Sequence, residues 1–443
     1  MSRPGISRRY LLQKAALCTA GVELATGPAR ATAGRILGAN DRISVGMVGP
    51  GARGLQLMDW IHRLSRAENL ELTGVCDIWN ERRESAVEMV KAWTGRVPHA
   101  CRTMAEMCER KDIDVLVVST VDFQHAPLAR QAVEAGKDVY VEKPFGCDFE
   151  QIKLAREAIR ASDRVFQAGT QLRSNGVPWA AHEFIAKGRL GKVSFVELVQ
   201  PLFHQRWRIP GAETALTEKD TNWKEFLCYA PQVPFNARHY REFRLFWPYS
   251  TGIFCQWMSH IIDLVNLVLG ERPKAVVAAG GTYVWNDGRT NPDTAHCLVE
   301  YPSGCLMSYH MRLGNGAHAR PLTFYGTNGT LDLDAGVAYG DGGGGEVILA
   351  NPGSLIPELI VDASRRLPDR HQGATILDAE PDGDHMVDFF RAVRTRCPTR
   401  AGVDAAFNHA LATTMAGMSW RLGARIEYDP IADSLNVGEP RKR

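Results

Sequence analysis

The segment Gly49–Gly54 constrains the fold of this chain more than any other, because it places three glycines directly after an apolar, β-rich run. It reads Gly-Pro-Gly-Ala-Arg-Gly and leads into the helical pattern Leu55–His62. A GxGxxG turn between a strand and a helix is typical of a dinucleotide-binding βαβ unit. Its glycines permit the tight turn, the close approach of a pyrophosphate and the packing of helix on strand. The predicted cofactor contacts in this turn are Gly49, Gly51, Ala52, Arg53 and Gly54.

An acidic residue ends the second predicted strand, Leu70–Asp77, 28 residues after Gly49. A carboxylate in this position accepts hydrogen bonds from both ribose hydroxyls and repels a 2′-phosphate, which favours NAD over NADP. Asp77 is therefore a predicted cofactor ligand. Two alternatives stay open: Asp77 caps the following helix, or Arg82 and Arg83 accommodate the 2′-phosphate of NADP.

Two further motifs follow in the first third of the chain. The strand Ile113–Thr120 leads to His125, and Ala135-Gly136-Lys137 precedes the triplet Glu142-Lys143-Pro144. In this order, and after the GxGxxG turn, they resemble the Gfo/Idh/MocA oxidoreductases, the relatives of glucose–fructose oxidoreductase and inositol dehydrogenase. Val121 stands where that family has proline. The Glu-Lys-Pro triplet is the most specific part of the resemblance.

The resemblance implies roles for several of these residues. Lys143 would stabilise an alkoxide that forms at a carbinol, aimed by a cis peptide bond to Pro144. Further contacts to the cofactor are expected at Thr120, His125, Glu142, Lys143 and Gln171. Arg173 is expected to face the same cleft.

The fold class predicted from this order is α/β. An N-terminal Rossmann dinucleotide-binding domain precedes a C-terminal α+β domain with a large open, mostly antiparallel sheet, for which alternating strands are expected between residues 192 and 334. The predicted divisions are a signal peptide at 1–33, the Rossmann domain at 40–165, the substrate and oligomerisation domain at 166–425, and a C-terminal tail at 426–443.

A helical segment after Gly252 carries the second set of predicted catalytic residues. Gln256, His260 and Asp263 follow one another at i, i+4 and i+7, which places them on one face of an α-helix. An imidazole there can take the proton of a carbinol, with a carboxylate to orient it. The family pattern has an aspartate where this chain has Gln256, so His260 is expected to carry the acid–base work more alone. Asp263 could equally accept from a backbone group or an arginine.

Residues 201–250 form an aromatic and basic segment whose role stays open. Aromatic rings beside arginine and histidine are typical of carbohydrate sites. The alternative is a loop packed by its own aromatic residues or used in subunit contacts. The residues concerned are His204, Arg206, Trp207, Trp223, Phe235, Arg238, His239, Tyr240, Arg244 and Trp247.

The N-terminus resembles a twin-arginine export signal, with Ser7-Arg8-Arg9 followed by a mildly apolar stretch and the small residues Ala29–Ala33. We therefore expect a periplasmic or otherwise exported protein, whose cofactor must be held tightly and regenerated in place, because free NAD is scarce outside the cytoplasm. The net charge of +2 and the lack of a basic stripe argue against nucleic acid as a partner. No apolar run is long enough to span a membrane.

The predicted function is hydride transfer between the nicotinamide of NAD and a carbinol of a sugar, glycoside or cyclitol, without a metal. A homo-oligomer, dimer or tetramer, is expected. One alternative is an NAD-dependent glycoside hydrolase or lyase that oxidises its substrate transiently. Another is a non-catalytic sugar-binding protein on the same fold.

Overall fold

The computed structural model describes residues 41–214, 216–340 and 374–440. Its first sheet has the strand order β3-β2-β1-β4-β5-β6, with all pairs parallel. The predicted twin-arginine signal lies outside the described residues. The elements of this part are β1 (Ile43–Val48), α2 (Ala52–Leu64), β2 (Leu70–Cys76), α3 (Asn80–Thr94), β3 (His99–Cys101), α4 (Met104–Glu109), β4 (Val115–Val118), α5 (His125–Glu134), β5 (Asp138–Val141), α6 (Phe149–Ala161) and β6 (Phe166–Ala168).

Local sequence explains these elements. The central strands β4 and β5 are buried at every position, because helices cover both faces of a parallel sheet. Asp148 caps the N-terminus of helix α6, because its side chain accepts a hydrogen bond from the backbone N–H of Gln151. Helix α3 ends at Gly95, which adopts a left-handed conformation.

The second sheet is larger and has the order β15-β14-β13-β12-β7-β10-β9-β8-β16-β17, with β11 paired to β7. Among the described strands of this second sheet, only the pair β7–β10 is parallel, which confirms the predicted fold class. Its strands are β7 (Val193–Phe203), β8 (Ala275–Gly281), β9 (Thr294–Glu300), β10 (Leu306–Arg312), β11 (Gly314–Asn315), β12 (Arg320–Gly326), β13 (Gly329–Asp332), β14 (Val337–Tyr339), β15 (Thr375–Ile376), β16 (Ile426–Asp429) and β17 (Ser434–Val437).

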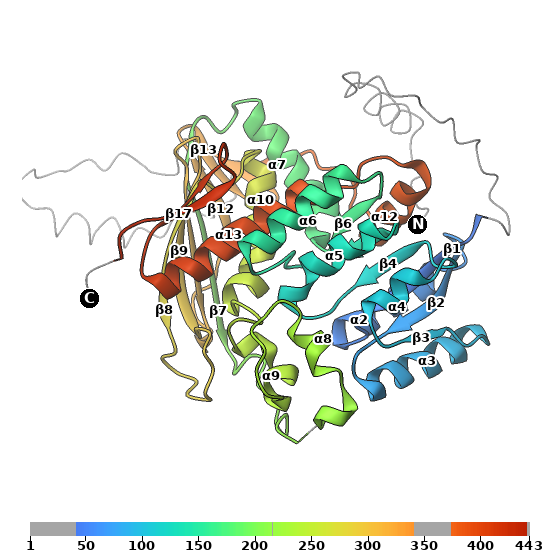
Figure 1. Cartoon of the computed structure of the whole chain (residues 1–443). Coiled ribbons are helices and arrows are strands. Elements are labelled where there is room, and N and C mark those ends of the chain that lie inside the picture. The colour runs from blue at the N-terminus through green and yellow to red at the C-terminus, as the bar shows by residue number, and fades with distance from the viewer. Residues whose placement is uncertain (1–40, 215, 341–373, 441–443) are drawn as a thin grey trace, which may run out of the picture.

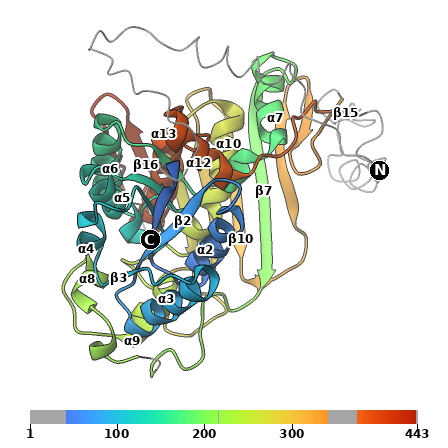
Figure 2. The same cartoon turned by 90° about the vertical axis from the view of Figure 1, so that its right-hand side faces the viewer.

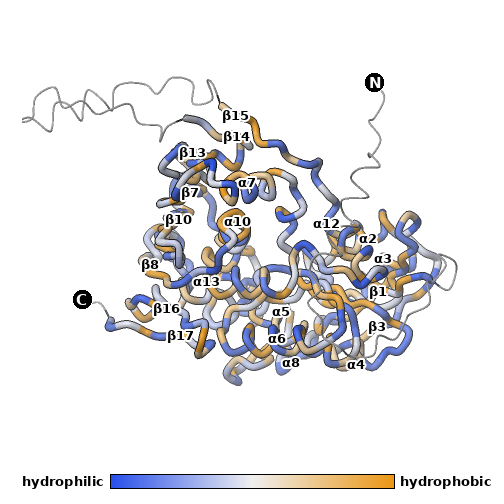
Figure 3. The backbone as a smooth tube through the Cα atoms, turned by 90° about the horizontal axis from the view of Figure 1, so that it is seen from above, coloured by the Kyte–Doolittle hydropathy of each residue, from blue (hydrophilic) through white to orange (hydrophobic). Residues whose placement is uncertain are grey.

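Helices join the two sheets into one body. Helices α7 (Gly176–Ala186), α10 (Ser259–Leu269) and α13 (Val403–Leu422) lie on the face of the larger sheet that is turned toward the first sheet (Figure 1). Seen from above, α10 and α13 lie between the two sheets (Figure 3). Helix α13 is apolar around most of its circumference and packs against both β8 and α6. No described helix is long and apolar enough to cross a membrane.

The C-terminal segment differs from the predicted tail at 426–443. Strands β16 and β17 extend the larger sheet beyond β8. Helix α12 (His385–Thr395) returns to the Rossmann domain, where Met386 and Phe389 share a core cluster with Val45. The apolar spacing of a helix shows that one face is buried, but it does not show which domain covers that face.

Residues 204–214 and 216–250 contact the segments that follow the carboxyl ends of β2 and β4. They include α8 (Trp223–Leu227) and α9 (Ala237–Arg241), which lie at the same end of the molecule as α3 (Figure 2). The backbone N–H of Asn222 donates to the carbonyl of Ile78 at 3.2 Å, and Gln124 Nε2 donates to the carbonyl of Phe226 at 2.7 Å. This segment therefore connects the two domains beside the glycine turn.

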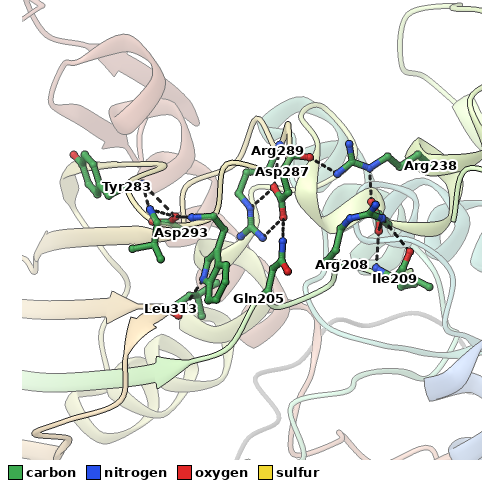
Figure 4. A network of polar contacts seen from close by, with 12 residues as sticks. Gln205, Arg208, Ile209, Arg238, Tyr283, Asp287, Arg289, Asp293 and Leu313 are labelled. Atoms are coloured by element: carbon green, nitrogen blue, oxygen red, sulfur yellow. Dashed lines mark hydrogen bonds and ion pairs between the residues drawn. The ribbon is translucent and has the colours of Figure 1, made fainter. Parts of the chain in front are cut away.

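A polar network ties the same segment to the loop between β8 and β9 (Figure 4). Glu242 is buried and accepts hydrogen bonds from the side chains of Arg208 and Arg238. Arg238 also donates to the carbonyl of Asp287, whose carboxylate binds Arg289 and Gln205. The guanidinium groups of Arg208 and Arg238 neutralise the buried carboxylate of Glu242. These bonds hold the start of the 3-10 turn Phe243–Leu245, which follows Glu242 directly.

Candidate active site in the cleft beside the glycine turn

A cavity of about 820 Å³ runs from the glycine turn to the start of α10. Its walls come from the carboxyl ends of the first sheet, from residues 209–244 and from the turn before α10. Most of the predicted site residues line it, namely Gly49, Gly51, Ala52, Arg53, Asp77, Thr120, His125, Glu142, Lys143, Gln171, Gln256 and His260. Gly54 and Asp263 do not.

Each of the three glycines in the turn has the separate structural role that the motif predicts. Gly49 has φ +81°, and a Cβ there would lie 2.7 Å from the carbonyl oxygen of Ser119. A Cβ on Gly54 would lie 2.3 Å from the carbonyl oxygen of Gly49, so this glycine serves the packing of α2 on β1. At Gly51 the nearest atom is 3.6 Å away, on the side chain of Arg82. The backbone at Gly51 is therefore open toward the cavity, and a pyrophosphate fits between it and the N-terminus of α2.

At one end of the cavity lies Asp77. Its Oδ1 accepts a hydrogen bond from the backbone N–H of Trp79 at 2.8 Å, and burial raises its pKa. Arg82 lines the cavity and stacks on the ring of Trp79, with 4.7 Å from its Cζ to the ring centroid. Arg83 points away, since it donates to the carbonyl of Asp77 and to Asn80. Of the two arginines considered for NADP, only Arg82 faces the cavity.

In the middle of the cavity, Glu142 is held by several donors. Its Oε1 accepts from Arg53 Nε at 2.8 Å and from Gln171 Nε2 at 3.0 Å. His125 Nδ1 donates to the carbonyl of Pro144 at 2.7 Å, so its Nε2 carries the lone pair. That Nε2 and the hydroxyl of Thr120 are buried without a partner among the described residues. Buried polar atoms of this kind fit the hydroxyl and amide groups of a bound nucleotide.

Lys143 and His260 lie at the other end. A cis peptide bond joins Lys143 to Pro144, as expected, and Lys143 Nζ donates to the backbone carbonyl of Gln256 at 2.7 Å. Burial lowers the pKa of Lys143. Burial also lowers the pKa of His260 to about 3, and the nearby Lys143 adds to this effect. The imidazole of His260 is therefore neutral and able to accept a proton.

Asp263, predicted beside His260 as a catalytic group, is turned away from the cavity. It is 1% exposed and accepts from Arg173 Nε at 2.7 Å. The prediction that Arg173 faces the cleft is therefore wrong, because its guanidinium belongs to this buried ion pair. A π-helical turn, Phe254–Met258, precedes α10. It changes the number of residues per turn on which the predicted common face depended.

Asp122 is a site residue that the sequence did not single out. It lies just after β4, lines the cavity and is 1% exposed. Its carboxylate accepts hydrogen bonds from Gln256 Nε2, Ser250 Oγ and Cys255 Sγ. Because the amide nitrogen of Gln256 is bound to Asp122, its Oε1 is left as an acceptor at the cavity. The position of Asp122 after a buried strand was the signal that could have identified it.

Asp122 also belongs to a group with metal-ligand character. Its carboxylate and the thiols of Cys147 and Cys255 lie within 4.8 Å of one another, and all three residues are buried. Burial raises the pKa of the Cys147 thiol, which favours its protonated form. Cys255 Sγ donates a hydrogen bond to the carboxylate of Asp122, and both cysteines belong to one core cluster, so the group serves the packing of this end of the cavity.

Residues of the aromatic segment 201–250 serve both as a lining of the cavity and as a loop packed by its own aromatic rings. Tyr240 and Arg244 line the cavity, and Tyr240 also belongs to a core cluster in which Trp223, Phe235 and other rings pack with one another. Rings of this cluster also contact the Rossmann domain, where Trp79 meets Tyr240 edge to face at 6.1 Å. The segment is therefore both a packed loop and one wall of the site.

Two family models match the chain. Residues 43–170 match the oxidoreductase family with an NAD-binding Rossmann fold, and residues 226–332 match the GFO/IDH/MocA C-terminal domain. Among solved structures, the WlbA dehydrogenase of Bordetella pertussis in complex with NADH and UDP-GlcNAcA has a TM-score of 0.61 at 19% identity, and the match covers 88% of this chain and 99% of that one. Levoglucosan dehydrogenase, in complex with NADH and levoglucosan, has a TM-score of 0.57 at 14% identity, covering 89% and 99%. At these identities the likeness shows the fold.

Curated relatives match a shorter stretch. A protein named glycosyl hydrolase family 109 protein 2, from Shewanella sp. (strain ANA-3), is 31% identical over 161 residues, which are 32% of this chain and 34% of that protein. An α-N-acetylgalactosaminidase from Shewanella oneidensis is 29% identical over 157 residues, 31% of this chain and 34% of that protein. The chain thus spans about a third of the length of the curated relatives that it matches.

Mutation of the buried ion pair between Asp263 and Arg173 can test whether this pair stabilises the fold. Asp263→Asn should destabilise the protein by about 3–5 kcal/mol, because it leaves the guanidinium of Arg173 buried without its counter-charge. Thermal denaturation measures this loss. The paired change Asp263→Leu with Arg173→Met should recover much of it. A variant Asp263→Asn with wild-type stability and lost activity would contradict this assignment.

Proposed function

We propose that this chain, which belongs to the Gfo/Idh/MocA family of oxidoreductases, transfers a hydride between a nicotinamide cofactor and a carbinol of a sugar, glycoside or cyclitol. The observation that carries the proposal is the position of Lys143, Gln256 and His260 at one end of a cavity whose other end is formed by the glycine turn. A bound nicotinamide would supply the hydride acceptor or donor.

The side chains at this end have complementary tasks in the proposed reaction. Neutral His260 takes the proton of the carbinol hydroxyl. The ammonium group of Lys143 stabilises the negative charge that develops on the oxygen. Burial is the main cause of the low pKa of His260, which makes the imidazole a weak base. The ammonium group of Lys143 lowers the pKa of a bound alcohol and so reduces the cost of this proton transfer. Gln256, held by Asp122, accepts a neighbouring substrate hydroxyl.

We propose NAD as the cofactor. Asp77 supports this choice, because its carboxylate lies at the cavity end where an adenosine ribose fits and repels a 2′-phosphate. Arg82 and Arg241 line the same end and favour NADP. A carboxylate that accepts both ribose hydroxyls is the more selective of these features.

We further propose an exported protein with a tightly held cofactor. The twin-arginine motif at Arg8 and Arg9 supports export of the folded protein. Residues 209–244 support retention, since they cover the cavity at the end that contains Asp77 and are anchored to the Rossmann domain. Release of a dinucleotide would require this cover to open.

A second candidate is glycoside cleavage through transient oxidation. The curated relatives that carry glycosidase names favour it, as does a covered cofactor end that suits a dinucleotide regenerated within each turnover. In this reaction, oxidation of one carbon acidifies the neighbouring C–H. Loss of that proton expels the leaving group, water adds in its place, and the hydride then returns to the oxidised carbon. The first and second candidates share Lys143 and His260.

Denaturing the purified protein should release one dinucleotide per chain, identified by mass spectrometry as NAD.

Lys143→Met should lower kcat/KM by about 10²–10⁴-fold, because the charge that stabilises the alkoxide is lost. Lys187→Met, at an exposed lysine that pairs with Glu183, serves as the control and should keep full activity. A protein free of dinucleotide, or a His260→Ala variant with undiminished activity, would contradict an enzymatic role for this cavity.

The pH profile tests the protonation states of the two groups. His260 is in its basic form at every pH above about 3, so kcat/KM should show no acidic limb near the ordinary histidine pKa of 6.5. Burial lowers the pKa of Lys143 below 10.5, so activity should fall at a pH below that value as the ammonium group loses its proton. Lys143→Arg should move this alkaline limb upward. An acidic limb near pH 6.5 that disappears in His260→Gln would contradict the neutral imidazole.

The two candidate reactions give different products. As-purified protein, without added cofactor, is incubated in D2O with p-nitrophenyl α-N-acetylgalactosaminide. Transient oxidation should release p-nitrophenol over many turnovers and introduce deuterium at the carbon next to the oxidised one. Net hydride transfer should instead increase absorbance at the band of the reduced nicotinamide, without cleavage, when sugars are supplied.

A further inference from the structure

The catalytic end of the cavity contains a cation that the proposed reaction does not use. Arg244 lines the cavity together with Lys143, Gln256 and His260. Its guanidinium forms no hydrogen bond or ion pair with any residue in the described part of the chain, and its Nε is buried without a partner. Buried arginine donors are ordinarily satisfied by carboxylates or carbonyls. The donors of Arg244 are therefore available to a ligand.

The backbone of Arg244 is held firmly. It lies in the 3-10 turn Phe243–Leu245, and its carbonyl accepts a hydrogen bond from Asn291 Nδ2 at 3.0 Å. The carbonyl of Leu245 accepts from the backbone N–H groups of Thr290 and Asn291 at 2.9 and 3.0 Å. Immediately before the turn, the carboxylate of Glu242 accepts hydrogen bonds from the side chains of Arg208 and Arg238. The guanidinium itself stacks on the ring of Phe243 at 4.4 Å. This arginine is thus preorganised for binding.

The charges around the catalytic end do not balance. Asp122 is engaged by Gln256, Ser250 and Cys255, and Glu142 is engaged by Arg53 and Gln171. Neither carboxylate contacts Arg244. Arg244 is close enough to Lys143 to lower its pKa, and both line the cavity, so two cations lie near each other at this end. Stabilising one alkoxide needs one of them.

We infer that the substrate is an anionic carbohydrate whose oxyanion group, a carboxylate, sulfate or phosphate, binds the guanidinium of Arg244 while its carbinol lies at Lys143 and His260. The inference rests on the proposed function and adds the substrate class. The planar fork of an arginine matches two oxygens of such a group. The pyrophosphate of the cofactor is accounted for by the open backbone at Gly51 and the start of α2.

The test compares matched sugars on the protein with its cofactor bound. The ligands are the methyl glycosides of glucose and galactose, the corresponding glucuronide and galacturonide, and the 6-phosphate and 6-sulfate of methyl glucoside. Binding is measured by calorimetry and turnover by cofactor reduction. The wild-type protein should bind at least one anionic member about 10- to 100-fold more tightly than its neutral partner. The preferred member distinguishes carboxylate from phosphate and sulfate.

Arg244→Gln should remove this preference by weakening binding of the anionic member about 10- to 100-fold, mainly through KM, while binding of the neutral member changes much less. Arg244→Lys should restore part of it. Arg130→Gln, at an exposed arginine that pairs with Glu134, is the matched control and should behave as wild type.

Several outcomes would overturn the inference. They are a wild-type protein that binds no anionic member more tightly than its neutral partner, an Arg244→Gln variant that weakens both members equally, and a variant that no longer retains its dinucleotide. The last outcome would assign Arg244 to the cofactor. Failure of the proposed function looks different, since a protein without dinucleotide, or one that binds these sugars without any hydride transfer or cleavage, would contradict the reaction and leave the binding comparison intact.

Discussion

The hydrogen bond from Lys143 Nζ to the backbone carbonyl of Gln256 connects the two halves of the site. Lys143 follows β5 of the parallel sheet, and Gln256 lies in the π-helical turn before α10 in the second domain. Through this contact the residue that can stabilise an alkoxide is fixed relative to His260, four residues further along. Helix α13 and residues 204–250 maintain the same arrangement from two other sides, because each packs against both domains.

The cavity is electrostatically uneven along its length. Near the glycine turn, backbone N–H groups and the N-terminus of α2 suit an anion, and Asp77 at the neighbouring strand end suits hydroxyl groups. At the other end, burial keeps His260 neutral, Lys143 brings positive charge close to it, and Arg244 lies near Lys143. A site of this kind favours the forms of a substrate that carry negative charge, whether it develops during the reaction or is present beforehand.

The residues whose roles depend on contacts with distant segments of the chain were the hardest to predict from the sequence. Asp263 has the spacing of an orienting partner for His260, yet it is paired with Arg173, which approaches from a segment 90 residues away in sequence. Asp122 carries no motif, yet it determines which end of the Gln256 amide faces the cavity. Arg244 was one of several cations in an aromatic segment, and only the structure shows that it lines the cavity together with Lys143.

The sequence by itself determined the Rossmann domain, the positions of the glycine turn and of Lys143, and the largely antiparallel character of the second sheet. These features depend on local rules, namely the conformational freedom of glycine, the period of apolar residues and the chemistry of strand ends. The tertiary structure alone decided that β16 and β17 join the larger sheet, that α12 returns to the first domain, and which charges at the cavity are already paired. Those outcomes depend on contacts between segments far apart in the chain, about which the spacing within any one segment carries no information.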